Sequence, residues 1–428
     1  MAIIAIETLF ERLDSVARAA EPKTSGFNAE RVSRMTALRV GIVGAGFAAE
    51  FHLTNLRRVY GMDVEIAGVT SLRAESRADF GRRHGIKPYA DAVSLIQDVD
   101  VIDICSPPSA HDEAMIAAAA AGKHIICEKP LSGYFGPEGC GEEYHGNRDP
   151  KGPMLEAVIE KLQKLAEAVR KAGVVFGYAE NFVYAPAVRK EAEIIRKTGA
   201  QVLRMLSEES HGGSASDVYG IWRFQGGGAL MGKGCHPLST MLYLKRVEGL
   251  ARNGKAIRPK TVTCRCETLT HLPNYEDKGF LRTEYHDTED NTMAHVVFED
   301  GTVADLFSGE VVMGGLYSYL EVFANNHRTR CNLSPAPLME TYNPSGPQFA
   351  DVYTVEKIST KEGWTTLAPE EGYTLGYADE MQDFLTCAAA GDRQPAADLD
   401  LALDTITTIY AAYLSDEQRG AEQEVPLL

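Results

Sequence analysis

The chain has 428 residues, with 43 lysines and arginines against 60 aspartates and glutamates, and a formal net charge of −17. Its hydrophobic content of 44% and charged content of 24% are ordinary for a globular protein of two or three domains. The acidity and the lack of a lysine- and arginine-rich block argue against nucleic acid as a partner. No apolar run reaches the roughly 20 residues that span a bilayer, so we expect no membrane association.

Residues 1–37 are typical of an N-terminal extension. Apolar residues recur at spacings of three and four within residues 1–20, which predicts an amphipathic helix. Glu7, Glu11 and Asp14 interrupt this stretch, unlike a secretory signal. The eight cysteines form no C-x-x-C pair, which favours reduced thiols in a cytoplasmic protein over a disulfide framework or a zinc site.

Strands alternate with helices through residues 38–177. We expect strands at 38–43, 63–70, 101–105, 124–127 and 174–177, and helices at 48–59, 74–84, 92–96, 111–121 and 154–171. This alternation predicts an α/β domain with a doubly wound parallel sheet.

A glycine-rich segment, residues 132–152, interrupts this alternation and has little periodicity of its own. It falls where a loop would cross near the ends of the predicted strands. Two interpretations stay open: a lid over the site, or a surface insertion.

From residue 178 to residue 428 the pattern changes to that of an α+β domain. Strands are predicted at 200–208, 260–267, 292–298, 302–312 and 317–323, and helices at 228–245, 377–390 and 398–417. The hairpin signal Glu299-Asp300-Gly301 favours a large, mostly antiparallel sheet. Helices would cover one face, the last of them packing back on the first domain. The open face predicts a homodimer or homotetramer.

A glycine fingerprint, Gly44-Ala-Gly46-Phe47-Ala48-Ala49, follows the first strand and opens a helix. Glycines there let the backbone approach a pyrophosphate, and the helix N-terminus favours its negative charge. The motif predicts dinucleotide binding. The simpler alternative is a tight turn between strand and helix.

The choice between NAD and NADP depends on the end of the second strand. An acidic residue there bonds the ribose hydroxyls of NAD, but this chain has Ser71 and Arg73 and no acid. Both side chains suit a 2′-phosphate, which slightly favours NADP. Ser106 and Pro107 follow the third predicted strand, under the expected cofactor position, and His111 either reaches the cofactor or begins the next helix.

Lys129 stands where a strand should end, in the sequence His124-Ile-Ile-Cys-Glu128-Lys129-Pro130. Ligands of open α/β sheets bind at the carboxyl ends of the strands, so Lys129 should point at the cofactor, with Glu128 beside it. Burial and a cationic nicotinamide would lower the pKa of Lys129. The alternative is an ion pair between Lys129 and Glu128.

Taken together, the glycine fingerprint, the loop 106–111 and Glu128-Lys129-Pro130 resemble the Gfo/Idh/MocA family of sugar and polyol oxidoreductases. The resemblance continues through Tyr178-Ala-Glu-Asn181 and residues 226–236, and covers most of residues 38–417. It implies a Rossmann domain followed by an α/β domain whose open sheet mediates oligomers. It also implies that Lys129 reaches the substrate hydroxyl and that His236 accepts or donates the proton, a task that suits imidazole.

The chain departs from the family pattern beside this histidine. The family usually has an aspartate four residues before it, where this chain has Gly232, and the acid often found three residues after it is Ser239. Glu180, Asp217 or a residue of segment 132–152 would have to supply a carboxylate.

Candidate substrate contacts are polar or aromatic residues downstream of Lys129: Asn181, Tyr184, His211, Trp222 and Arg223. Trp222 suits stacking on a sugar ring and Arg223 an oxygen-rich ligand, although core packing and a solvated ion pair are alternatives. Because His211, His236 and Glu209 have no metal-site spacing, we expect no metal.

The leading interpretation is an NAD(P)-dependent oxidoreductase that transfers a hydride between a secondary hydroxyl of a sugar, polyol or glycoside, or the matching ketone, and the cofactor. A second is a lyase or glycoside hydrolase that uses a retained NAD for transient oxidation. A third is a non-catalytic nucleotide-sensing protein. The substrate, the oxidised carbon and the direction do not follow from the sequence.

Overall fold

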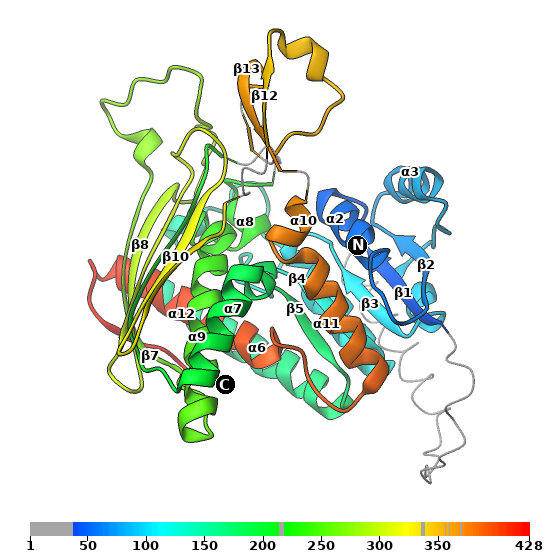
Figure 1. The fold of residues 1–428 in the computed structure, drawn as a ribbon, viewed down its shortest axis with the longest axis horizontal. Helices are drawn as coiled ribbons and strands as arrows, with labels where there is room; N and C mark the ends of the chain where they lie inside the picture. Colours follow the sequence, from blue (N-terminus) through cyan, green and yellow to red (C-terminus); the bar gives the residue numbers. More distant parts are fainter. Residues whose placement is uncertain (1–36, 214–217, 335–338, 356, 359, 369) are drawn as a thin grey trace.

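Two large sheets, one in each half of the chain, organise the molecule (Figure 1). The computed structural model describes residues 37–213, 218–334, 339–355, 357–358, 360–368 and 370–428. The amphipathic helix predicted within residues 1–20 and the candidate carboxylate Asp217 lie outside the described residues. Within the described ranges, no helix combines the length and apolarity needed to cross a membrane.

The first sheet has five parallel strands in the order β2-β1-β3-β4-β5. Its strands are β1 (Leu38–Val43), β2 (Val64–Thr70), β3 (Val101–Ile104), β4 (His124–Glu128) and β5 (Phe176–Ala179). Helices α2 (Phe47–Leu56), α3 (Ala74–His84), α4 (Ala92–Gln97), α5 (His111–Ala120) and α6 (Lys151–Ala172) connect them. The predicted doubly wound Rossmann-type sheet is confirmed.

Burial explains why these strands are parallel and why their apolar runs are continuous. All four residues of β3 are buried, as are all four of β5, because helices cover both faces of the sheet. Parallel strands also bring their carboxyl ends to one edge. The turn after β1, the loop after β3 and Lys129 after β4 therefore lie along that edge.

The second sheet has seven strands in the order β11-β10-β6-β9-β8-β7-β14. Its strands are β6 (Val202–Ser210), β7 (Pro259–Glu267), β8 (Asn291–Phe298), β9 (Val303–Gly309), β10 (Tyr317–Ala324), β11 (Arg328–Asn332) and β14 (Gln423–Glu424). Only β6 and β9 pair in parallel, so the predicted mostly antiparallel sheet is confirmed. Helix α9 (Cys235–Asn253) packs on β6 and α12 (Leu399–Glu417) on β7, while α7 (Pro186–Thr198), which was not predicted, packs on α9.

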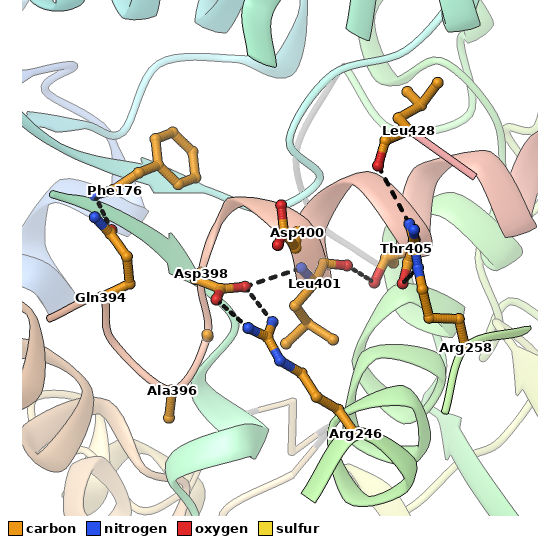
Figure 2. A network of polar contacts seen from close by, with 12 residues as sticks. Phe176, Arg246, Arg258, Gln394, Ala396, Asp398, Asp400, Leu401, Thr405 and Leu428 are labelled. Atoms are coloured by element: carbon orange, nitrogen blue, oxygen red, sulfur yellow. Dashed lines mark hydrogen bonds and ion pairs between the residues drawn. The ribbon is translucent and has the colours of Figure 1, made fainter. Parts of the chain in front are cut away.

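The last helices of the chain pack on elements of the first domain. Helix α11 (Tyr377–Ala390) packs on α2, and α12 packs on α6 and β5. Figure 2 shows how the start of α12 is fixed: Asp398 accepts the Leu401 N–H at 3.1 Å and takes both Arg246 nitrogens, at 2.5 and 2.6 Å. Upstream of this helix, Gln394 accepts the Phe176 N–H at 3.0 Å. These contacts connect the start of α12 to α9 and, through the preceding loop, to β5.

Segment 132–152 is anchored to elements of the second half. The Tyr134 N–H donates to the Tyr410 hydroxyl at 2.5 Å, and the Gly146 N–H donates to Asp287 at 2.7 Å. The segment therefore packs against α12 and the loop before β8. Its exposed residues are 137–139, 142–143, 147–148 and 150.

A small two-stranded sheet, β12 (Met339–Asn343) with β13 (Gly363–Leu367), projects from the body as an arm above the other two sheets (Figure 1). Two short helices, α8 (Trp222–Gln225) and α10 (Glu371–Thr374), lie near the junction of the two halves. The arm was not predicted, because its strands are short and largely polar.

Candidate active site

The turn between β1 and α2 has the shape that a phosphate cradle requires. Gly44 has φ +125°, and a Cβ there would lie 2.5 Å from the Cys105 carbonyl oxygen, so only glycine fits. At Gly46, by contrast, a Cβ would meet no atom within 4 Å, and no side chain caps the helix that begins at Phe47. The first turn of α2 therefore offers free N–H groups beside open space, which fits a dinucleotide pyrophosphate.

The end of β2, where the ribose of a dinucleotide would lie, carries no carboxylate. Ser71 is half-buried and donates its hydroxyl to the Arg73 carbonyl at 3.0 Å, while the Arg73 side chain is exposed. Arg77 donates to the Ser71 carbonyl at 2.9 Å and fixes the loop. This rim presents a cation and a hydroxyl to the solvent.

His111 begins α5 and joins two loops. Its ring nitrogens lie 2.8 Å from the Ser106 carbonyl oxygen and 3.1 Å from that of Pro130. The side chain has no exposed surface. In this conformation the His111 side chain lies at the start of α5 and holds the Ser106 and Pro130 carbonyls.

Lys129 leaves β4 and reaches across to the second domain. Its ammonium donates to the Gly232 carbonyl at 2.9 Å, in the π-helical turn Leu230–Gly234 that precedes α9. Glu128 does not take the ammonium but accepts the Lys129 backbone N–H at 2.8 Å and lies 3.1 Å from His52 Nε2. Lys129 thus bridges the first sheet and the turn that leads to His236.

The pKa of Lys129 is raised, so the lowered pKa expected from the sequence is wrong for the protein on its own. Burial acts to lower it, but the groups around the ammonium act in the opposite direction and prevail: Cys235 and Tyr219 in their ionised forms, and the carboxylates of Glu128 and Glu209. Near neutral pH the two carboxylates carry this charge. The ammonium form of Lys129 can donate a hydrogen bond to a substrate oxygen.

His236 lies in the first turn of α9 between two carboxylates. Glu180 Oε1 is 2.5 Å from Nδ1, and Glu209 Oε2 is 3.9 Å from Nε2. Burial acts to lower the pKa of His236, but Glu180 and Glu209 outweigh it and raise the pKa above its ordinary value. One ring nitrogen is thus occupied, while the other faces a carboxylate beyond hydrogen-bonding distance.

The remaining candidate contacts divide into two groups. His211 belongs to the site: burial and the charges of Lys233, Lys357 and Lys129 lower its pKa, so it is neutral, and its Nδ1 accepts the Gly213 N–H at 3.1 Å. Tyr184 and Asn181 are buried, one bonded to Asp383 at 3.0 Å and the other to the Leu375 carbonyl at 2.8 Å.

The side chains of Trp222 and Arg223 make polar contacts with segment 132–152 and not with Lys129 or His236. Trp222 is 2% exposed and donates its indole N–H to the Tyr134 carbonyl at 2.9 Å, so it anchors segment 132–152 as a core residue. Arg223 lies 3.7 Å from Glu142 of the same segment, whose carboxylate is largely exposed. Both side chains follow the alternatives that the sequence left open, packing and a surface ion pair.

The residues that sequence reasoning underrated are the buried acids around the site. Glu180 was only one of several possible replacements for the missing aspartate, and Glu209 was considered only as a metal ligand. A buried ion pair between Lys233 and Glu310 was not foreseen. An acid directly after a buried strand, as Glu180 follows β5, is the one signal that could have indicated the first.

Side-chain atoms of the types that can bind a metal lie close together in two places in the described ranges. Glu180, Cys235 and His236 form one group and His52, Asp103 and Cys105 the other, each with its atoms within 4.8 Å. In the first, the Lys129 ammonium lies beside Cys235 and repels a cation. In the second, His52 already bonds Asp103 at 2.8 Å and Glu128 at 3.1 Å.

Comparison with known proteins agrees with this fold. Residues 38–140 match the model of the oxidoreductase family with an NAD-binding Rossmann fold, named GFO_IDH_MocA. Myo-inositol 2-dehydrogenase of Thermotoga maritima is 35% identical over 98 residues, which are 22% of this chain and 29% of that protein. Levoglucosan dehydrogenase of Pseudarthrobacter phenanthrenivorans is 30% identical over 225 residues, 49% of this chain and 52% of the other.

A solved structure extends the likeness to the whole fold. GenD2 from gentamicin A biosynthesis, in complex with NAD, superposes with a TM-score of 0.71 at 21% identity, covering 95% of this chain and 99% of the other. The two curated relatives match over about half of their length or less. Residues 38–140 of this chain are thus similar to the Gfo/Idh/MocA oxidoreductase family, and the curated relatives support that similarity.

Proposed function

We propose that this protein is an NAD-dependent dehydrogenase that oxidises a secondary hydroxyl of a sugar, polyol or glycoside, or reduces the corresponding ketone. The observation that carries the proposal is the meeting of Lys129 and His236. Lys129 reaches the carbonyl of Gly232, four residues before His236, at the edge of the sheet that also holds the glycine turn. The inositol and levoglucosan dehydrogenases among the relatives act on substrates of this class.

The two side chains have different tasks in this reaction. His236 accepts the hydroxyl proton at Nε2, the ring nitrogen that has no hydrogen bond at close range. Lys129 donates from its ammonium to the same substrate oxygen and stabilises the charge that develops as the proton leaves. The glycine turn at Gly44 and Gly46 would hold NAD, which would supply the hydride acceptor for the carbinol carbon. In the reverse direction His236 returns the proton to the ketone oxygen.

The proposal extends to NADP as a second cofactor. Arg73 is exposed at the end of β2, Ser71 is its near neighbour, and no acid stands there to repel a 2′-phosphate. Titration of both cofactors by fluorescence would test this. Arg73→Ala should weaken NADP binding severalfold and leave NAD binding nearly unchanged, whereas equal effects on both would restrict the protein to NAD.

A turnover panel tests the main proposal. Purified protein is mixed with polyols, sugars and glycosides and either cofactor, and both the reduced cofactor and the products are measured. Net reduced cofactor with a ketone product supports a dehydrogenase. Product without net reduced cofactor would instead mean transient oxidation by a lyase or hydrolase. Cofactor binding without any turnover would mean a nucleotide sensor. Lys129→Met should abolish turnover and retain cofactor binding.

The second sheet supports a further part of the proposal, a homo-oligomer. Its face opposite α9 and α12 carries half-exposed apolar side chains in register across strands, including Met293 beside Phe307. Charged residues lie among them, such as Asp305 with Arg204 at 3.0 Å. Light scattering should give the mass of a dimer or tetramer. Phe307→Arg should reduce the measured mass, because a charge on this face weakens the association.

A cytoplasmic location completes the proposal. All eight cysteines are free thiols, and the two nearest sulfurs, those of Cys264 and Cys266, are 3.7 Å apart. Unpaired thiols are stable in a reducing compartment. Fractionation of cells that produce the protein would test this location.

A further inference from the structure

The carboxylate that the family usually places four residues before His236 is absent in this chain, where Gly232 holds that position and the Gln225 amide lies beside it. A Cβ at Gly232 would lie 2.3 Å from Gln225 Nε2, which donates to the Gly228 carbonyl at 3.0 Å. The Gly232 carbonyl itself is taken by Lys129. An acidic side chain at this position would have to displace the Gln225 amide, so the site must obtain its negative charge elsewhere.

Glu180 occupies a rigid position on the other side of His236. It follows β5, has no exposed surface, and its carbonyl accepts the Val183 N–H at 3.2 Å. Its Oε1 lies 2.5 Å from His236 Nδ1, while its Oε2 is buried without a hydrogen-bond partner. The Phe182 ring lies 4.8 Å from the imidazole and limits its rotation.

The charged and titratable groups that face His236 come from four elements. They are Glu180 after β5, Glu209 on β6, Glu128 and Lys129 at the end of β4, and Cys235 on α9 itself. Lys129 acts to lower the histidine pKa and Glu209 to raise it, but Glu180 is the only one of these groups in hydrogen-bond contact with the ring. The thiol of Cys235 has a raised pKa because it is buried, so it is neutral and adds no charge near pH 7.

We infer that Glu180 is the positioning residue of His236 and replaces the aspartate that this chain lacks at Gly232. Its carboxylate accepts a hydrogen bond from the Nδ1–H, which fixes the tautomer with its lone pair on Nε2, facing Glu209. It also balances the imidazolium that forms when Nε2 takes the substrate proton. The inference rests on the proposed function for the identity of the base, but the contact itself can be tested without a substrate.

The direct test is the titration of His236 by NMR of the full-length protein with ¹⁵N-labelled histidine. The resonance is assigned by its loss in His236→Gln. In the unchanged protein His236 should titrate above 6.5, and its neutral form should carry the proton on Nδ1. Titration below 6.5, or a proton on Nε2, would overturn the inference without the need for any Glu180 variant.

Glu180 variants then isolate its charge. Glu180→Gln should lower the pKa of His236 by at least about one unit, a tenfold change in the protonation constant, and Glu180→Asp should restore most of it. The matched control is Glu191→Gln, because Glu191 is equally buried and contacts His327 at 2.8 Å, on the outer side of α7. The inference fails if Glu180→Gln moves the pKa of His236 no more than Glu191→Gln does.

Turnover adds a second readout, which depends on the proposed function, whereas the NMR readout does not. For hydroxyl oxidation, Glu180→Gln should reduce kcat roughly 10- to 100-fold, with KM within about threefold, and move the rise of kcat/KM with pH to lower pH. An equal loss of kcat at every pH would count against the positioning role. If no hydroxyl substrate is turned over by the unchanged protein but the NMR result holds, the proposed function fails and the Glu180–His236 contact stands.

Discussion

Two histidines in this protein lie between pairs of carboxylates, yet only one is available for chemistry. His52 is fully buried under the glycine turn, 2.8 Å from Asp103 and 3.1 Å from Glu128, so both its nitrogens are bonded. His236 is 6% exposed, with Glu180 at 2.5 Å and Glu209 only at 3.9 Å. A histidine between two carboxylates forms a structural cross-link when both ring nitrogens are bonded, as in His52, whereas in His236 one nitrogen is left open for the proposed role of proton acceptor.

The largest effect should come from a substitution of His236, the histidine with one unbonded ring nitrogen. His236→Gln removes the base but leaves an amide that can still donate to Glu180, so the fold should persist. We expect kcat to fall 10²- to 10⁴-fold, the usual contribution of a general base, with cofactor affinity nearly unchanged. Steady-state kinetics and cofactor titration measure both. Turnover within tenfold of the unchanged protein would remove His236 from the reaction.

A substitution of His52, whose two ring nitrogens are both bonded, should instead lower the unfolding free energy. His52→Gln leaves Asp103 and Glu128 buried without their counter-charge, which typically costs about 3–5 kcal/mol of unfolding free energy. Urea denaturation at neutral pH measures this. Turnover below the melting range should fall far less than in His236→Gln. If turnover is lost and stability is kept, the division between the two sites is wrong.

The pH dependence sharpens the same contrast. Burial acts to lower the pKa of His52, but Asp103 and the other neighbours raise it well above 6.5. A raised histidine pKa stabilises the fold fully below 6.5, and the stability is lost as pH rises through the folded-state pKa. The stability difference between the unchanged protein and His52→Gln should shrink by up to about 1.4 kcal/mol per pH unit in that window. Urea denaturation at pH 6 and pH 9 would reveal it, and a constant difference would contradict it.

The smallest effect concerns a third buried acid. Glu289 accepts the N–H groups of Gly228 and Leu230 at 3.1 and 3.0 Å and the Tyr413 hydroxyl at 2.9 Å, yet burial raises its pKa to about 7. Its charge therefore costs stability progressively as pH rises from about 4.5 to about 7, and in full above that range. Glu289→Gln keeps an acceptor oxygen and should stabilise the fold by about 1–2 kcal/mol at pH 8, with little gain near pH 4. Thermal unfolding at both pH values checks this, and a loss at pH 8 would mean that the charge itself holds the turn.

The first domain was predictable because local pattern and burial agree there. Strand 38–43 and helix 74–84 were placed with the observed bounds, since parallel strands buried on both faces carry continuous apolar runs. The hairpin of β12 and β13 was not predicted, because strands such as Met339–Asn343 are polar and short. Helix α7 is amphipathic and was simply not recognised in the sequence.

The site was predictable in its motif residues and not in its electrostatics. The sequence brought Lys129 and His236 together through the family resemblance, and their bridging through Gly232 agrees with that. The direction of the Lys129 pKa was missed, because burial can be read from a strand but the acids that surround the ammonium come from distant strands. Glu209 on β6 is such a residue.

The π-helical turn at Leu230–Gly234 has a consequence for changes of chain length. With one residue more per turn than an α-helix, it sets the rotation at which α9 begins. Each residue of an α-helix turns by about 100°, so a single deletion there would swing His236 away from Glu180 while every side chain of the pocket stayed the same. The geometry of the site thus depends partly on the number of residues in this turn, and a deletion could inactivate the site without changing any of its side chains.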